Sequence, residues 1–316
     1  MKQIAFLIQD SDAIEDGNYL RFSNELLQRG IEVCLCNIDS LSMLHSQVCA
    51  QGFYINAQIH PGDQFPELRS IRLQDIETIW VLGLGFRNNF LDKLQLIYCL
   101  EKFCRVLNSS NAILNLKSKY SLAGYSEIFD YPQSFSSTDP KALYDVIKAS
   151  GHKWIAKPPA GSMGRDIFLI SADDPNAQVI LETMTGAQSD QYCLLQAYVE
   201  EIQAGEKRVV FAGGKVVGQY LRLQNKDHRT NLVQGAEIRS CELNALEQKT
   251  CHKIGKFLLS QGAEYVGVDL VHPYVIEMNV INPGGLLTIE SLEGKNLTNN
   301  IIDNIFPDTK LVSIQR

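Results

Sequence analysis

The sequence predicts an α/β protein built from several lobes, the first of which is expected to contain a parallel sheet. At the start of the chain, short apolar segments typical of strands alternate with amphipathic segments typical of helices. From Tyr192 to Val280 predicted strands dominate instead, which indicates a second kind of lobe. The chain has 316 residues, 45% of them hydrophobic, enough to bury a sizeable core and to favour two or three subdomains over one unit.

The charge balance and the absence of targeting signals narrow the class of protein. With 36 acidic and 29 basic residues the formal net charge is -7, which is the wrong sign for a protein that binds a nucleic acid backbone. There is no uncharged apolar run of about 18 residues, and Met1-Lys2-Gln3 leads straight into a predicted strand. We therefore expect a cytoplasmic protein whose partners include neither nucleic acid nor membrane. The eight cysteines lack CxxC spacing and are interpreted as reduced core residues.

The first lobe is expected to be a parallel sheet covered by helices. Its predicted elements are the strand Ile4–Ile8, a helix over Tyr19–Arg29 ended by Gly30, and the strands Glu32–Ile38 and Thr78–Leu82. The tip Gly83-Leu84-Gly85 lacks the third glycine and the acidic residue of a dinucleotide-binding loop, so an ordinary turn is the better interpretation.

A smaller unit follows Asn115. It is predicted to contain helices over Lys117–Ile128 and Pro140–Ser150 and the strands Lys153–Ala156 and Ile167–Ile170. Further along, Arg208–Phe211 and Lys215–Tyr220 flank Gly213-Gly214, a strong hairpin signal because such turns need positive φ. A helix is predicted over Leu246–Gln261, where Gly262 ends it.

The most informative segment consists of two apolar strands around the turn His272-Pro273-Tyr274. If the turn is symmetric about Pro273, Val271 pairs with Val275 and Asp269 lies opposite Glu277. Opposed Cβ atoms in an antiparallel pair are about 5 Å apart, so two carboxylates there repel. A divalent cation would remove that repulsion.

Asn279 lies two residues beyond Glu277 and is expected on the same face of the strand. Two carboxylates and one amide oxygen suit magnesium, which keeps some water ligands and binds substrate phosphates. Asp269, Glu277 and Asn279 are therefore predicted metal ligands. The alternative is a solvated polar face on an edge hairpin, which alternation alone often produces.

A second segment, from Lys157 to Arg165, places a lysine at a strand end before a loop that contains Gly161 and Gly164. Such a lysine can bind one phosphate while loop N–H groups surround the others. The pattern is not the GxxxxGK[ST] of a P-loop, and a simple hairpin loop with a surface lysine is an equal alternative.

Two further segments are weaker signals. Leu194–Glu200 is an apolar strand that becomes polar, a hinge whose main chain could bind an adenine edge; an ordinary core strand is the alternative. A local basic series suggests a site for polyanionic phosphate, although each member alone is more commonly a surface charge. It comprises Lys207, Arg208, Arg222 and Arg229, with Asn231 close by.

In this order, the four segments resemble the ATP-grasp superfamily and, within it, the bacterial glutathione synthetases. The resemblance covers nearly the whole chain and is sharpest at Leu195–Val199, Gly205–Val209 and the Val266–Asn279 hairpin. It implies an α/β fold with α+β lobes, namely an ATP-grasp fold with an N-terminal Rossmann-like domain. The implied divisions are residues 1–118, a central lid subdomain at 119–195, and a catalytic subdomain at 196–316.

The resemblance also implies roles for individual residues. ATP would be bound by Lys119, Lys157, the mobile glycine loop Gly161, Ser162, Met163 and Gly164, the adenine hinge Gln196, Ala197, Tyr198 and Val199, and Lys207. The transferred phosphoryl group and the acceptor would face Arg222, Arg229 and Asn231. Magnesium, with Mn²⁺ able to substitute, would be held by Asp269, Glu277 and Asn279.

The activity implied is an ATP-dependent carboxylate–amine ligase that works through an acyl phosphate, as a glutathione synthetase does with γ-glutamylcysteine and glycine, and a homotetramer or homodimer is expected. Two segments depart from that family. Gly83–Phe90 replaces an Arg-Lys-Asp-Pro-Pro-type segment, and Asn282–Glu290 lacks the usual arginine. The first alternative is therefore an ATP-grasp ligase of another dipeptide or amino-acid pair, and a further one is a non-catalytic nucleotide-binding protein.

Overall fold

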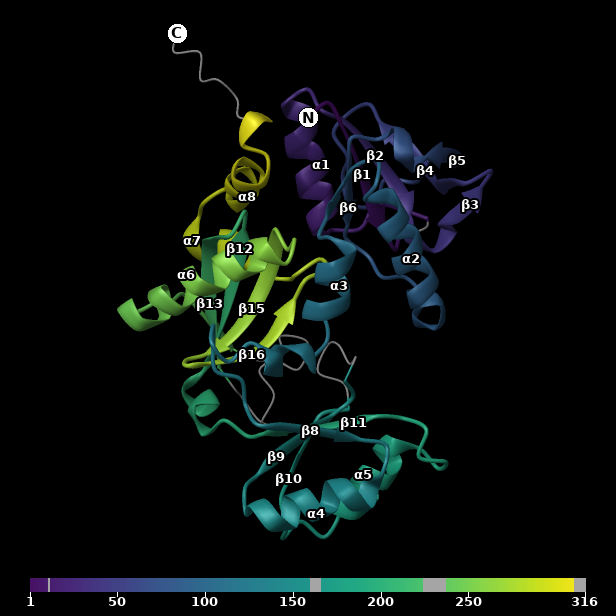
Figure 1. The fold of residues 1–316 in the computed structure, drawn as a ribbon. Helices are drawn as coiled ribbons and strands as arrows, with labels where there is room; N and C mark the ends of the chain where they lie inside the picture. The colour runs from purple at the N-terminus through teal and green to yellow at the C-terminus, as the bar shows by residue number, and fades with distance from the viewer. Residues whose placement is uncertain (11, 160–165, 224–236, 310–316) are drawn as a thin grey trace.

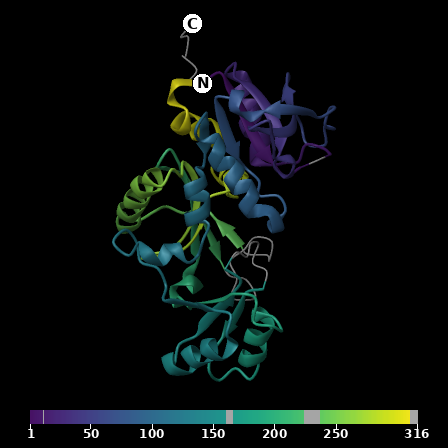
Figure 2. The ribbon, with the colours of Figure 1, turned by 45° about the vertical axis from the view of Figure 1, so that its right-hand side comes forward.

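The computed structural model describes residues 1–10, 12–159, 166–223 and 237–309. Three lobes are visible in Figures 1 and 2, each built around its own sheet. The N-terminal lobe and the central lobe lie at opposite ends of the molecule, with the C-terminal lobe between them. No helix within the described residues is both long and apolar enough to cross a membrane.

The N-terminal lobe contains a seven-stranded sheet in the order β3-β4-β2-β1-β6-β7, with β5 paired to β4. Its parallel part is formed by β1 (Gln3–Ile8), β2 (Glu32–Asn37), β6 (Thr78–Val81) and β7 (Arg105–Leu107). This confirms the predicted strands. The helices of the lobe are α1 (Asn18–Gln28) and α2 (Phe90–Leu100).

The sheet is mixed, not purely parallel as the alternating pattern suggested. Between β2 and β6 the chain adds β3 (Ser42–Leu44), β4 (Gln47–Ile55) and β5 (Arg69–Arg72), and all three pair antiparallel. Tight pairing of β4 with β2 requires Gly52, because a Cβ there would lie 2.3 Å from the carbonyl oxygen of Leu35. A glycine inside a strand weakens the sequence signal for that strand, which explains why it was not predicted.

The central lobe is a four-stranded antiparallel sheet in the order β10-β9-β11-β8, packed against two helices. Its strands are β8 (Ser134–Ser137), β9 (Trp154–Lys157), β10 (Phe168–Ile170) and β11 (Cys193–Ala197), and its helices are α4 (Pro140–Ser150) and α5 (Ala177–Thr185). The side chains of Leu143, Ile147, Trp154 and Leu195 form a buried cluster of this lobe's own.

The C-terminal lobe contains a five-stranded sheet in the order β14-β13-β12-β15-β16. The strands are β12 (Glu206–Ala212), β13 (Lys215–Leu223), β14 (Glu237–Arg239), β15 (Tyr265–Val271) and β16 (Tyr274–Asn279), and the helices are α6 (Ala245–Ser260), α7 (Leu286–Glu293) and α8 (Leu297–Ile305). The predicted hairpin turn is confirmed, since Gly213 and Gly214 both have positive φ.

The helix predicted over Lys117–Ile128 is wrong. The α-helix here is α3 (Ser110–Leu116), and only a 3₁₀ turn, Ser121–Gly124, follows it. The Ser109 hydroxyl accepts a hydrogen bond from the backbone N–H of Ala112, so Ser109 is an N-cap that starts the helix earlier than expected.

The predicted divisions at 118/119 and 195/196 stay predictions, but two features differ from a lid made of residues 119–195. Strand β11 continues to Ala197, two residues beyond the second division. Leu122 and Phe129 lie in the buried cluster of the C-terminal lobe and not in that of the central lobe. The segment before Ser134 therefore packs with the C-terminal lobe.

The N-terminal and C-terminal lobes share one hydrophobic core. The Phe22 and Trp80 rings stack with their centroids 4.7 Å apart, and Tyr265 of β15 meets both edge-on. The buried amide of Asn108 donates to the carbonyl oxygens of Tyr265 and Val280 at 2.8 and 2.7 Å. These contacts hold the two lobes together.

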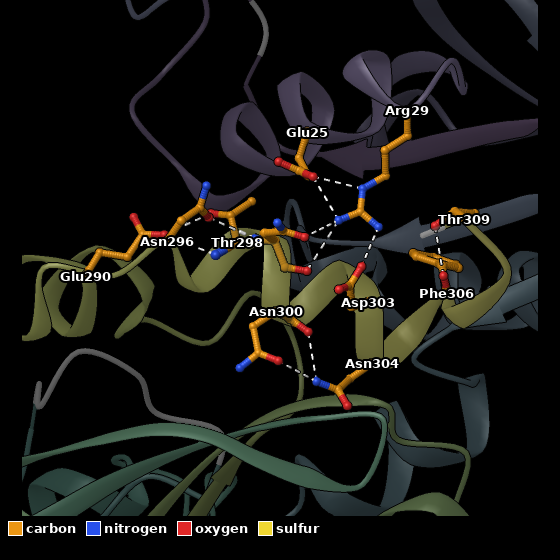
Figure 3. Close-up of polar contacts among 11 residues, drawn as sticks. Glu25, Arg29, Glu290, Asn296, Thr298, Asn300, Asp303, Asn304, Phe306 and Thr309 are labelled. Atoms are coloured by element: carbon orange, nitrogen blue, oxygen red, sulfur yellow. Dashed lines mark hydrogen bonds and ion pairs between the residues drawn. The ribbon is translucent and has the colours of Figure 1, made fainter. Parts of the chain in front are cut away.

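Figure 3 shows the polar part of the same junction, between α1 and α8. The Arg29 side chain is only 1% exposed and forms ion pairs with Glu25 and with Asp303, the latter at 2.7 Å. It also donates to Asn299. Separating the buried guanidinium from its acceptors would cost free energy, because the charge would stay desolvated. The helices α1 and α8 are therefore expected to move as one body.

Candidate active site

One face of the C-terminal sheet carries an alternating set of charges. Arg222 lies opposite Glu206 in the β13–β12 register, Arg208 lies opposite Asp269 between β12 and β15, and Asp269 lies opposite Glu277 between β15 and β16. Side chains two residues apart share a face, so Glu206 and Arg208 point the same way. The strands thus bring five charged groups from distant parts of the sequence together.

Asp269 is at the centre of this set. Arg208 donates to it through two nitrogens, Nε at 2.5 Å from Oδ1 and Nη2 at 3.1 Å from Oδ2. Arg222 Nη2 lies 2.6 Å from Oδ1 of Asp269 and 2.7 Å from Oε2 of Glu206. All four side chains are at most 9% exposed, so the pairs are shielded from solvent.

The charge states follow from these contacts. Burial alone would raise the pKa of Asp269, but the Arg208 and Arg222 guanidiniums hold it below its usual value. Burial opposes the charge of Arg222, whereas Asp269 and Glu206 raise the pKa of its guanidinium above the ordinary value. Asp269 and Arg222 are therefore both charged at neutral pH.

The predicted opposition of Asp269 and Glu277 is confirmed, although the turn is not symmetric. Val271 pairs with Tyr274, not with Val275 as predicted, and a register shift between Asp269 and Leu270 restores the expected pairing at the carboxylates. Glu277 accepts a hydrogen bond from Lys119 Nζ at 3.0 Å.

The positive side chains near Asp269 and Glu277 weaken the argument that these carboxylates need a metal ion to offset their repulsion. Asp269 is compensated by two arginines and Glu277 by Lys119, so repulsion between the carboxylates alone does not require a divalent ion. The donor set still fits magnesium, because both carboxylates and the Asn279 amide gather on one face, with Asn279 Nδ2 3.4 Å from Asp269 Oδ2. Within the described ranges no group of three or more His, Cys, Asp or Glu side chains forms a metal site.

Lys157 stands at the end of β9, directly before the predicted glycine loop. Its Nζ donates to Gln196 Oε1 of β11 at 2.7 Å, and both side chains are buried. Burial lowers the pKa of Lys157 to about 8, against the smaller opposing effect of Glu277. Among the residues that the structure describes, this ammonium has one neutral hydrogen-bond partner, and such a buried charge is a good binding group for an anion.

The predicted adenine hinge lies where β11 ends. The amides of Ala197 and Tyr198 donate to the carbonyl oxygens of Gln133 and Lys153, at 2.8 and 3.0 Å. These two N–H groups are therefore committed to the protein. An adenine edge would have to use other main-chain groups of the hinge, such as those of Val199.

Lys207 does not join the site. Its Nζ donates to Glu247 at 2.6 Å and to the carbonyl oxygen of Glu242 at 2.9 Å, on the side of the sheet where α6 begins. Neighbouring residues of a strand face opposite sides of the sheet, so Lys207 lies on the other side from Arg208. Contact between Lys207 and the nucleotide stays a prediction, and the structure does not bring this side chain to the charged face.

Glu206 is a site residue that sequence reasoning did not name, and Arg208 entered only as a member of the basic series, without a role of its own. The alternation of side chains along a strand could have identified them. If Asp269 lies on one face of the sheet, its cross-strand partner Arg208 and the residue two positions before it, Glu206, lie on the same face. Lys207, between them in sequence, must then lie on the opposite face. Six other predicted residues lie outside the described residues, namely Gly161, Ser162, Met163, Gly164, Arg229 and Asn231.

Sequence comparison finds a family model and several known proteins that match this chain. Residues 119–294 match the family model described as the ATP-grasp domain of prokaryotic glutathione synthetase. A glutathione synthetase from Prochlorococcus marinus subsp. pastoris is 25% identical over 302 residues, covering 93% of this chain and 96% of that protein.

Two solved structures share the fold at low sequence identity. The D-cycloserine synthetase DcsG has a TM-score of 0.67 at 14% identity, covering 98% of this chain and 100% of that one. The ATP-grasp ligase PsnB, solved with a precursor variant, Mg and ADP, has a TM-score of 0.63 at 16% identity, covering 98% and 99%.

Proposed function

Because the chain belongs to the prokaryotic glutathione synthetase family with an ATP-grasp domain, and is an ATP-dependent ligase of that type, we propose that it joins a carboxylate to an amine through an acyl phosphate. The first candidate pair is γ-glutamylcysteine with glycine, the substrates expected of a glutathione synthetase.

The charged face supports the first half-reaction. A carboxylate is a poor electrophile, and phosphoryl transfer to it needs positioning and charge neutralisation more than covalent help from the protein. Arg222 Nε is buried and has no hydrogen-bond partner within the described residues. This N–H is the observation that carries the proposal, since an unpaired buried donor on a cation is available to a phosphoryl oxygen.

Magnesium is proposed as the cofactor, with Mn²⁺ able to replace it. The oxygen atoms of Asp269, Glu277 and Asn279 would hold the ion, which would neutralise phosphate charge. Lys119 and Lys157 would bind ATP phosphates. In the second half-reaction the amine displaces phosphate, and the site must exclude water because water would compete.

The direct test is ADP release in the presence of ATP and magnesium, with a panel of dipeptides and amine acceptors. Turnover of γ-glutamylcysteine with glycine is the expected result. Turnover of a different pair alone would support the second candidate, a ligase of another dipeptide or amino-acid pair. No ADP release with any pair would contradict ligase activity.

The second candidate rests on the segment after β6, which departs from the family pattern. The buried Lys93 donates to Asp39 at 2.6 Å and to the Phe86 carbonyl oxygen at 2.8 Å, while Asp39 also accepts from the Phe86 amide. Gly85 has φ +61° and lies against Asp39, so the local backbone is fixed. This rigid turn presents Phe86, 66% exposed, in place of the family's charged segment.

Nucleotide binding is expected to take up a proton near pH 8 to 9. Lys157 has a pKa of about 8 in the free protein, and a bound phosphate would favour its charged form, so ATP affinity should fall as the pH rises through that range. Calorimetry in buffers with different ionisation heats measures this uptake. In Lys157→Met the uptake should disappear, and an unchanged uptake would assign it to another group.

We also propose that the protein is cytoplasmic and forms a homodimer or homotetramer, as the family resemblance implies. Light scattering on the purified chain measures its mass directly. A monomer at all concentrations would contradict the proposed assembly.

A further inference from the structure

A pocket of about 620 Å³ opens in the N-terminal lobe at the carboxyl ends of β1 and β6, where Ile8, Leu82 and Gly83 line it. Within the sheet β1 has β2 as its neighbour on one edge and β6 as its neighbour on the other edge, so the order of the strands reverses at β1. This is the switch point of the strand order, where open α/β sheets bind their ligands.

The pocket also reaches the catalytic lobe. Asn282, three residues after the predicted metal ligand Asn279, lines it, and its Oδ1 accepts a hydrogen bond at 2.8 Å from Asn18 Nδ2 of α1. The two segments that depart from the glutathione synthetase pattern, 83–90 and 282–290, therefore meet here through Gly83 and Asn282. A pocket formed where both differ is suited to determine substrate choice.

The charges around the pocket have one sign. Asp10, Asp12 and Glu15 line it, and no lysine or arginine does so among the described residues. The Tyr19 hydroxyl donates to Asp10 and accepts from the Glu15 amide, and burial keeps the pKa of this phenol well above its usual value, so it stays protonated. The start of α1 also borders the pocket, but a helix N-terminus supplies only about half a positive charge. This is much smaller than the combined negative charge of the three carboxylates.

We propose that this pocket binds the ammonium group of the small-molecule substrate and so selects substrates that carry a free amine. The inference rests on the proposed ligase function for its context, because the pocket adjoins the loop that follows the candidate metal ligands. It assigns recognition to Asp12 and Glu15, which are exposed and open to a ligand. A cation with three nearby carboxylates gains both charge attraction and hydrogen bonds.

The test compares binding of free and N-acetylated compounds by calorimetry. The probes are γ-glutamylcysteine and the common amino acids, each against its N-acetyl derivative, with the wild-type chain, an Asp12→Asn/Glu15→Gln double variant and a Glu67→Gln control. Glu67 is an exposed carboxylate of the same lobe that does not line the pocket. Because all three residues are exposed, the variants should fold, which thermal melting checks.

At least one free amine is expected to bind the wild type about tenfold more tightly than its N-acetyl form, and the double variant should lose most of that preference while Glu67→Gln keeps it. Equal binding of both forms, no binding of any probe, or an unchanged preference in the double variant would overturn the proposal.

ADP release with the same compounds separates this inference from the proposed function. Amine-selective binding without ADP release under any condition would refute the ligase and leave the pocket assignment standing. ADP release without amine-selective binding would leave the ligase standing and refute the pocket.

Discussion

Glu277→Gln is expected to lower ligase turnover at least about a hundredfold without unfolding the protein. The substitution keeps the side-chain shape but removes a negative charge from the predicted metal ligands. The Glu277 carboxylate is 32% exposed, and the substituted amide can still accept a hydrogen bond from the buried Lys119, so the cost in stability should be smaller than for a fully buried ion pair. ADP release measures turnover, and thermal melting confirms the fold.

Binding of metal-free ATP distinguishes the metal role from a general loss of the site. Glu277→Gln removes a negative charge beside the Lys119 ammonium, so metal-free ATP should bind at least as tightly as in the wild type. Glu293→Gln is the matched control, because that carboxylate pairs with the exposed Lys295 and lies outside the charged face. Wild-type turnover in Glu277→Gln would show that the metal assignment is wrong.

Asp269→Asn is expected to destabilise the fold by roughly 3–5 kcal/mol in addition to abolishing activity. The substitution removes the negative charge that lies between Arg208 and Arg222, while both guanidiniums stay buried. Removing one partner of a buried ion pair costs more than the pair itself contributes, because the remaining charges stay desolvated. Denaturant unfolding followed by fluorescence measures the difference.

Asp145→Asn is the control for this prediction. Asp145 pairs with Lys141 and Lys148 on the exposed face of α4, where solvent screens the charges, so no measurable change in stability is expected. If Asp269→Asn behaved like Asp145→Asn, the buried cluster would not contribute to stability as described.

The predicted hairpin shows how far local sequence reasoning reaches. Asp269 was placed opposite Glu277 by counting outward from Pro273, and this pairing is confirmed. The count assumed that Val271 pairs with Val275, which is wrong, and the register shift beside Leu270 cancels the error. Register inside a hairpin is local information, whereas a bulge depends on packing that the sequence pattern does not show.

The counter-ions of the carboxylates could not be predicted in the same way. Arg208, Arg222 and Lys119 reach Asp269 and Glu277 from three other parts of the chain, up to 158 residues away. Their proximity depends on the strand order of the C-terminal sheet, which composition and periodicity leave open. For the same reason Lys207, adjacent to Arg208 in sequence, looked equally suitable for the site and lies on the other side of the sheet.

The stacked Phe22 and Trp80 rings against Tyr265 have a consequence for how the protein can be divided. An N-terminal fragment ending before Ser109 would present these aromatic faces to water and would be prone to self-association. The central lobe has its own buried cluster around Trp154 and can loosen without disturbing that junction. Hydrogen exchange should therefore reveal two cooperative units, the central lobe alone and the N-terminal and C-terminal lobes together, in place of three.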